Sequence, residues 1–187
     1  MSNFCDRDRD RDRESLEFKS LVFNAGNIND GAETEPDTVQ LGAADSGFSI
    51  MGWLLPQGDT DEYSLYFNVP RDAFNKSRNT KVFVHLLTDN FDIPGNRFAI
   101  RLSSLFTRAN GVVNADNIQV NNSGNIRVQN SGASFRYSHY VIEFCLDDIV
   151  RAEDFALLSV ARVTIPGDFT GPLLLTSIEF RYLSCEA

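Results

Sequence analysis

The fold is decided by the pattern KVFVHLLT (residues 81–88), which the turn sequence IPGN separates from a second segment, RFAIRLSSLF (residues 97–106). Both segments are rich in aliphatic, aromatic and β-branched residues and are bounded by turn-forming residues, which is typical of β-strands. Segments of the same kind recur at short spacing: LEFKSLVF (16–23), FSIMGWLL (48–55), YSLYFNV (63–69), YVIEFCL (140–146), ALLSVARVTI (156–165) and LLLTSIEFRYL (173–183). Because no helical pattern alternates with them, the sequence predicts an all-β sandwich or barrel.

The 187-residue length suits a single domain over residues 16–187 that follows an N-terminal arm over residues 1–15. In the arm Asp and Arg alternate, and a helix would place like charges four residues apart, so the arm is expected to be extended or disordered. It is either a solvated tail or a segment that orders against a neighbouring subunit through its arginines. The predicted assembly arm consists of Cys5, Asp6, Arg7, Asp8, Arg9, Asp10, Arg11, Asp12 and Arg13.

A short repeat lies in the middle of the chain, where NIQVNNSG (117–124) is followed by NIRVQNSG (125–132). Alternating Ile and Val followed by Asn-Ser-Gly predict two short strands that form a hairpin finger near residues 117–132. The finger is either a decorated loop or a surface that contacts a partner. Its contact residues would be Ile118, Val120, Ile126 and Val128.

The chain has three cysteines. Cys145 lies in the apolar run VIEFCL and is expected to be a small buried side chain. Cys5 and Cys185 lie near the two ends of the sequence. They are either free thiols or a disulfide, within one chain or between subunits.

The formal net charge of −9 argues against nucleic acid and anionic membranes as partners, and leaves sugars and divalent cations open. No segment approaches the roughly 20 apolar residues of a membrane span. No secretory signal is visible, so the protein is expected to be made in the cytoplasm without a signal peptide; a protein that stays there and one that leaves by cell lysis would have the same sequence features.

No catalytic constellation is found in the sequence. There is no G-x-S-x-G elbow, no phosphate-binding loop and no closely spaced histidine pair for a transition metal. His85 and His139 are interpreted as surface or hydrogen-bonded residues. Trp53, the one tryptophan, lies between apolar residues and is expected in the core. The sequence therefore predicts no catalytic residues and no cofactor.

Calcium is the candidate ion, because two predicted loops carry oxygen ligands at alternate positions. Carboxylates are also common in turns, so the same residues fit an ordinary loop. The candidate ligands are Asp59, Asp61 and Glu62 in one loop, and Asp89 and Asp92 in the other.

The stretches YSLYFNVPRDAF…TKVFVHLL and YVIEFCLDDIVRAEDFALLSVARV…FTGPLLLTSIEFRY resemble the jelly-roll domains common in virion proteins of tailed phages and other viruses. The resemblance spans roughly residues 48–182 and implies an antiparallel β-sandwich of jelly-roll type. It also implies a non-enzymatic structural protein that self-assembles as a homo-oligomer, or decorates a virion or other extracellular or surface assembly. The alternative is a carbohydrate-binding or adhesion module, with glycans as partners and calcium as a candidate ion. The third hypothesis is an enzyme that acts on glycans.

Overall fold

The computed structural model describes residues 16–29, 36–41, 48–55, 57, 62–74, 80–89, 97–108, 110–129, 137–147, 150–171 and 173–185. Its strands are β1 (Leu16–Asn24), β2 (Asp37–Leu41), β3 (Phe48–Leu55), β4 (Glu62–Asn68), β5 (Lys81–Asp89), β6 (Arg97–Thr107), β7 (Gln119–Asn122), β8 (Ile126–Arg127), β9 (Tyr137–Cys145), β10 (Phe155–Val163) and β11 (Leu173–Cys185). Two single-turn 3₁₀ helices, Ala25–Asn27 and Ala115–Asn117, lie in connections. Among the described residues no helix is long and apolar enough to cross a membrane.

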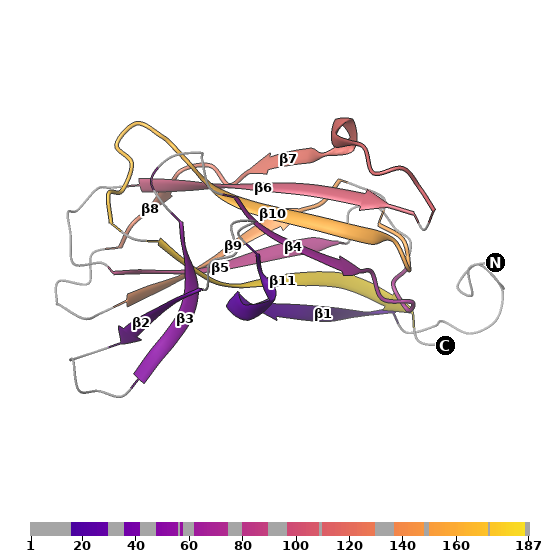
Figure 1. The fold of residues 1–187 in the computed structure, drawn as a ribbon, viewed down its shortest axis with the longest axis horizontal. Helices are drawn as coiled ribbons and strands as arrows, with labels where there is room; N and C mark the ends of the chain where they lie inside the picture. The colour runs from indigo at the N-terminus through magenta and orange to yellow at the C-terminus, as the bar shows by residue number, and fades with distance from the viewer. Residues whose placement is uncertain are drawn as a thin grey trace.

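The strands form two facing antiparallel sheets (Figure 1). The first has the order β2-β3-β11-β5-β9, with β1 also paired to β11. The second has the order β4-β10-β6-β7, with β8 also paired to β6. The protein is therefore an antiparallel β-sandwich of jelly-roll type, as the sequence predicts.

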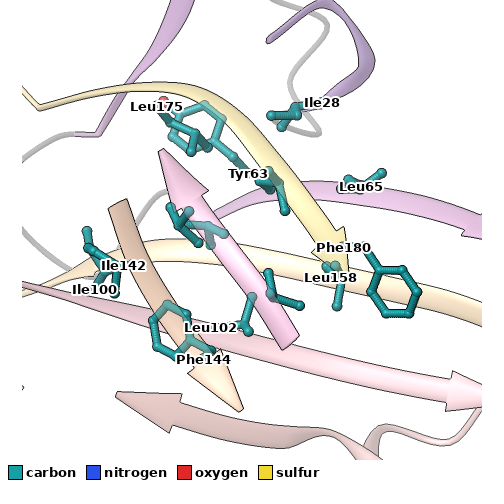
Figure 2. Close-up of a cluster of buried hydrophobic side chains, with 14 of the residues drawn as sticks. Ile28, Tyr63, Leu65, Ile100, Leu102, Ile142, Phe144, Leu158, Leu175 and Phe180 are labelled. Carbon is teal, nitrogen blue, oxygen red and sulfur yellow. The ribbon is translucent and has the colours of Figure 1, made fainter. Parts of the chain in front are cut away.

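The core lies between the two sheets, because one face of each strand is apolar. On β5, Val82, Val84 and Leu86 are fully buried, and burial of each such side chain contributes roughly 1.5–3 kcal/mol. Trp53 is buried and donates its indole N–H to the Ala25 carbonyl at 2.9 Å, which confirms its place in the core. Figure 2 shows the side chains that meet between the sheets: Ile100, Leu102 and Leu158 from one, and Ile142, Phe144 and Phe180 from the other.

β11 changes partner along one of its edges. Residues Leu173–Leu175 pair with β3, whereas Ser177–Cys185 pair with β1 (Figure 1). On its other edge β11 pairs with β5, and the register of that pairing shifts between Leu175 and Ser177. This shift is a β-bulge, a feature that bends a strand and redirects its side chains. The bulge and the end of β1 fall at the same point of the sheet.

A glycine lets β3 lie close to β11. A Cβ atom on Gly52 would lie 2.5 Å from Leu174 Cγ and 2.9 Å from the Leu175 carbonyl oxygen. Neither contact is compatible with a side chain at this position, so the strands approach closely because residue 52 has none.

The two repeat units do not form the expected hairpin with each other. β7 pairs with residues Arg101–Ser104 of β6, and β8 pairs with Arg97 and Phe98 of the same strand. The first Asn-Ser-Gly turn is held against β6, since Ser123 N donates to the Ile100 carbonyl at 2.9 Å and Ile100 N donates to Ser123 Oγ at 3.0 Å. The repeat therefore forms an interrupted edge strand.

The four proposed contact residues of the finger also divide into two groups. Ile118 and Val120 are 40% and 54% exposed. Val128 is buried in the core, and Ile126 packs against it. Only the first repeat unit thus presents an apolar surface to solvent.

Cys145 is exposed, and the expectation of a buried thiol is wrong. In β9 and just after it, Ile142, Phe144 and Leu146 point into the core, so Glu143 and Cys145 occupy the alternate, outward positions. The apolar run forms a strand as expected, but the alternation of its side chains places Cys145 on the face that is exposed to solvent. Cys5 and the rest of the arm lie outside the described residues, as does the side chain of Cys185.

Candidate functional site

A cleft opens where β1 ends and β3 takes its place beside β11. Its volume is about 300 Å³, which is at the lower end of the range for small-molecule sites. The residues that line it are all neutral: Asn24, Ala25, Gly26, Ile50, Met51, Thr176 and Ser177.

One wall of the cleft is polar, and the β-bulge builds it. Successive residues of a regular strand point to opposite faces, but the register shift at residue 176 brings both Thr176 and Ser177 to the cleft. The Thr176 hydroxyl donates to the His85 carbonyl at 3.2 Å, which fixes its direction. Asn24, the last residue of β1, is aligned with Ser177. An amide and two hydroxyls therefore lie side by side.

Ile50 and Met51 of β3 add apolar groups to the lining of the cleft. Met51 is 50% exposed, and its unbranched thioether side chain adapts to different shapes. Ala25 and Gly26 of the 3₁₀ turn also line the cleft, and the Ala25 carbonyl accepts the Trp53 N–H bond. The Trp53 ring packs against Tyr63 at 5.2 Å between centroids, and Tyr63 donates its hydroxyl to the Leu54 carbonyl. The turn that lines the cleft is thus anchored to the core.

Beside the cleft, the outer face of the first sheet carries the two histidines of the protein. His85 is aligned with Ser177 of the cleft. Its Nδ1 lies 3.2 Å from Nε2 of His139 on β9, and the two rings are 17° from parallel. Burial lowers the pKa of His85, and the neighbouring His139 lowers it further, although Glu179 acts in the opposite direction. His85 is therefore neutral at neutral pH.

Glu179 of β11 completes this arrangement. Its Oε2 lies 3.6 Å from His85 Nε2. Its Oε1 accepts hydrogen bonds from Ser20 Oγ at 2.6 Å and from Arg181 Nη2 at 2.8 Å. Burial raises the pKa of the Glu179 carboxyl, but the bonds from Ser20 and Arg181 outweigh it, so the pKa is lowered and the group is ionised. The Arg181 guanidinium also lies 4.3 Å from the centre of the Phe83 ring.

Of the predicted calcium ligands, only Glu62 has its side chain in the part of the chain that the structure describes. Glu62 accepts hydrogen bonds from Arg101 at 2.6 Å and from Ser159 at 3.1 Å. The side chain of Asp89 and the residues Asp59, Asp61 and Asp92 lie outside the described part. Within that part, no group of three or more His, Cys, Asp or Glu side chains could hold a metal ion. Calcium binding by these loops remains a prediction.

Sequence reasoning missed both the cleft and the histidine pair. The cleft is lined by three separate segments, and its polar wall depends on a bulge that has no signal in LLLTSIEFRYL. His85 and His139 are 54 positions apart. Their contact follows from the pairing of β5 with β9, which the strand pattern alone does not specify. The sequence does show, from the alternation within each strand, which residues point outward, and this was the one signal that could have placed both histidines on the outer face.

No protein-family model matches the sequence. No curated protein matches it either. Solved structures of similar fold include the CBM22-1 xylan-binding domain from Paenibacillus barcinonensis, with 11% identity over 89% of this chain and 95% of that one, and a TM-score of 0.44. A family 35 carbohydrate-binding module from Clostridium thermocellum has 13% identity over 88% and 98% of the two chains, with a TM-score of 0.41. CBM27-1 from Caldicellulosiruptor saccharolyticus, solved with mannohexaose, has 13% identity over 86% and 96%, with a TM-score of 0.42.

These findings correct the expected function. A self-assembling or decorating structural protein of a virion or surface assembly is wrong, because the similar solved structures are carbohydrate-binding modules. The resemblance behind that expectation consisted of strand order and spacing, which unrelated jelly-roll proteins share and which do not specify what a surface binds.

Proposed function

We propose that this protein is a non-catalytic carbohydrate-binding module and that the cleft beside the β11 bulge binds a neutral sugar. The observation that supports this most is the neutral lining of the cleft, which combines the polar residues Asn24, Thr176 and Ser177 with the apolar residues Ile50 and Met51. A sugar ring has hydroxyl groups at its edge and C–H groups on its faces, so it matches a lining that offers both polar and apolar groups.

The polar wall suits hydroxyl groups in particular. An amide and a hydroxyl each both donate and accept hydrogen bonds, as a sugar hydroxyl does. An anionic ligand would be left without a charged partner, because the described lining carries no Lys, Arg or His side chain. The overall charge of −9 also disfavours anions.

The lining also favours binding without catalysis. Glycosidases use a pair of carboxyl groups that flank the scissile bond. None of the residues that line the cleft has a carboxyl group or an imidazole to serve as general acid or base.

The test is isothermal titration calorimetry with soluble neutral oligosaccharides, including xylohexaose and mannohexaose, after a screen on a glycan array. Asn24→Ala and Ser177→Ala each remove one hydrogen-bonding group at the surface and are expected to weaken binding about 2- to 10-fold. Met51→Glu introduces a charge into the apolar part of the lining and is expected to weaken binding further. The matched control is Asn122→Ala, an exposed Asn of β7 in the other sheet. Absence of binding to every neutral glycan, or equal affinities for all four variants and the wild type, would overturn the proposal.

A further inference from the structure

The histidine pair on the outer face of the first sheet is a separate feature of the molecule. His85 is aligned with Val141 of β9 and His139 with Leu87 of β5, so the two histidines are diagonal neighbours on adjacent strands. Their ring centroids are 5.4 Å apart while His85 Nδ1 and His139 Nε2 are 3.2 Å apart. With the rings close to parallel, these distances place the two nitrogens between the ring centres, each facing the other.

Glu179 lies beside the nitrogen of His85 that faces away from His139. The ionised carboxylate lies 3.6 Å from Nε2, so it favours a proton on Nε2 and leaves the lone pair on Nδ1, the atom that faces His139. Ser20 and Arg181 hold Glu179 in place. A carboxylate behind the far nitrogen of a histidine is the arrangement that orients histidine ligands in metal sites.

We propose that His85 Nδ1 and His139 Nε2 are two ligands of one divalent transition-metal ion, which replaces the proton that the two nitrogens share. Zinc binds imidazole nitrogen at about 2.0–2.1 Å. Two nitrogens 3.2 Å apart have the separation of neighbouring ligands around a tetrahedral or tetragonal ion, and the exposed His139 ring turns on binding so that both lone pairs point at the ion and not at each other. Copper, nickel and zinc suit imidazole, and copper(II) binds most tightly in that series.

The described residues supply two ligands, and water completes the coordination. No third His, Cys, Asp or Glu side chain joins the pair in the described part of the chain. An ion has access to the site, because His139 is exposed and the His85 side chain is 21% exposed. The net charge of −9 raises the local concentration of cations. This site is distinct from the calcium loops, whose oxygen ligands suit a hard cation.

The experiment is electron paramagnetic resonance of the full chain with one equivalent of Cu²⁺, paired with calorimetric titration of Zn²⁺. The wild type is expected to show superhyperfine coupling to two imidazole nitrogens and a single Zn²⁺ site. His139→Ala is expected to reduce the coupling to one nitrogen, and the double variant H85A/H139A to abolish the site. Any binding by the arm or the chain terminus persists in the double variant and is subtracted.

Two glutamate variants separate the positioning effect from simple charge. Glu179→Gln is expected to weaken Zn²⁺ binding about 10-fold or more, as loss of such an outer carboxylate usually does. Glu143→Gln removes the same charge from the same face, at a residue bonded to Lys81 and not to either histidine, and is expected to leave the affinity unchanged. The proposal is overturned if the double variant binds as tightly as the wild type, or if the wild-type spectrum shows coupling to fewer than two nitrogens. Sugar binding has no part in these measurements.

Discussion

The guanidinium of Arg162 and the carboxylate of Asp168 lie 3.0 Å apart in the core, with side chains 1% and 2% exposed. Arg162 belongs to β10, and Asp168 lies in the connection to β11. Arg162 also donates to the carbonyls of Phe169 and Gly171. The pair therefore anchors the connection that leads into the central strand of the first sheet.

Removing one partner leaves an uncompensated buried charge. Asp168→Ala is expected to lower the free energy of unfolding by about 3–5 kcal/mol, measured by urea denaturation. The double variant R162M/D168A removes both charges and is expected to be less destabilised than the sum of its two single variants. Equal stability of Asp168→Ala and the wild type would contradict the assignment of the pair as an anchor.

Asp154 is a buried carboxyl whose pKa is raised by its burial, although Arg108 acts in the opposite direction. A raised pKa in the folded state means that this group stabilises the protein at acid pH, and that this stability is lost as the pH rises through the folded-state value. Asp154→Asn retains an acceptor for the Arg151 N–H bond of 3.0 Å and has no charge. It is expected to raise the melting temperature at neutral pH, with a difference that shrinks and disappears in acid. Asp147→Asn, at an exposed residue, is the charge-matched control.

Asp72 shows the opposite pH dependence. Burial raises the pKa of its carboxyl, but hydrogen bonds from Lys19, Ser184 and Tyr182 outweigh it, so the pKa is lowered. The stability that it contributes is present above the ordinary carboxyl range and is lost as the pH falls through the folded-state value. Because Asp72 is partly exposed, Asp72→Asn is expected to cost only about 1 kcal/mol at neutral pH. Denaturation curves at neutral and acid pH measure the effect, and a larger loss in acid than at neutral pH would refute this reading.

Gly52 links the stability of the fold to the shape of the cleft. Gly52→Ala places a Cβ atom against Leu174 and the Leu175 carbonyl, so β3 must shift away from β11 and carry Ile50 and Met51 with it. The expected cost is about 1–3 kcal/mol, with weaker sugar binding by the folded variant. Gly26→Ala is the control for stability, since a Cβ atom there meets nothing within 4 Å. Thermal melting of both variants distinguishes a displaced strand from a general effect of added methyl groups. For the sugar titration of Gly52→Ala the control is Asn122→Ala, because Gly26 itself lines the cleft.

Local pattern in the sequence was sufficient for the strands that carry long apolar runs. FSIMGWLL coincides with β3, and the other predicted segments differ from the observed strands by a few residues at their ends. β2 was missed because it lies in a polar stretch that is rich in breakers and carries few apolar residues. The expected burial of Cys145 is wrong because the run that contains it has apolar residues on both faces of the strand.

The candidate sites could not be predicted from local pattern, because both depend on which strands are neighbours in the sheet. The contact of His85 with His139 requires β5 to lie beside β9. The cleft requires β1 to end where β3 begins on the same edge of β11. Neither relation follows from periodicity, since strands with the same pattern pair in many orders.

The partner change along β11 also has a consequence for how the chain folds. β1, β3 and β5 all pair with β11, although β11 is far from each of them in the sequence. Ser20 of β1, for example, bonds to Glu179 of β11 across 159 positions. Contacts between residues this far apart close large loops and slow folding. During synthesis the first strand must therefore remain without its sheet partner until β11 has left the ribosome. The first sheet consequently assembles late, and the same event that completes it creates the cleft.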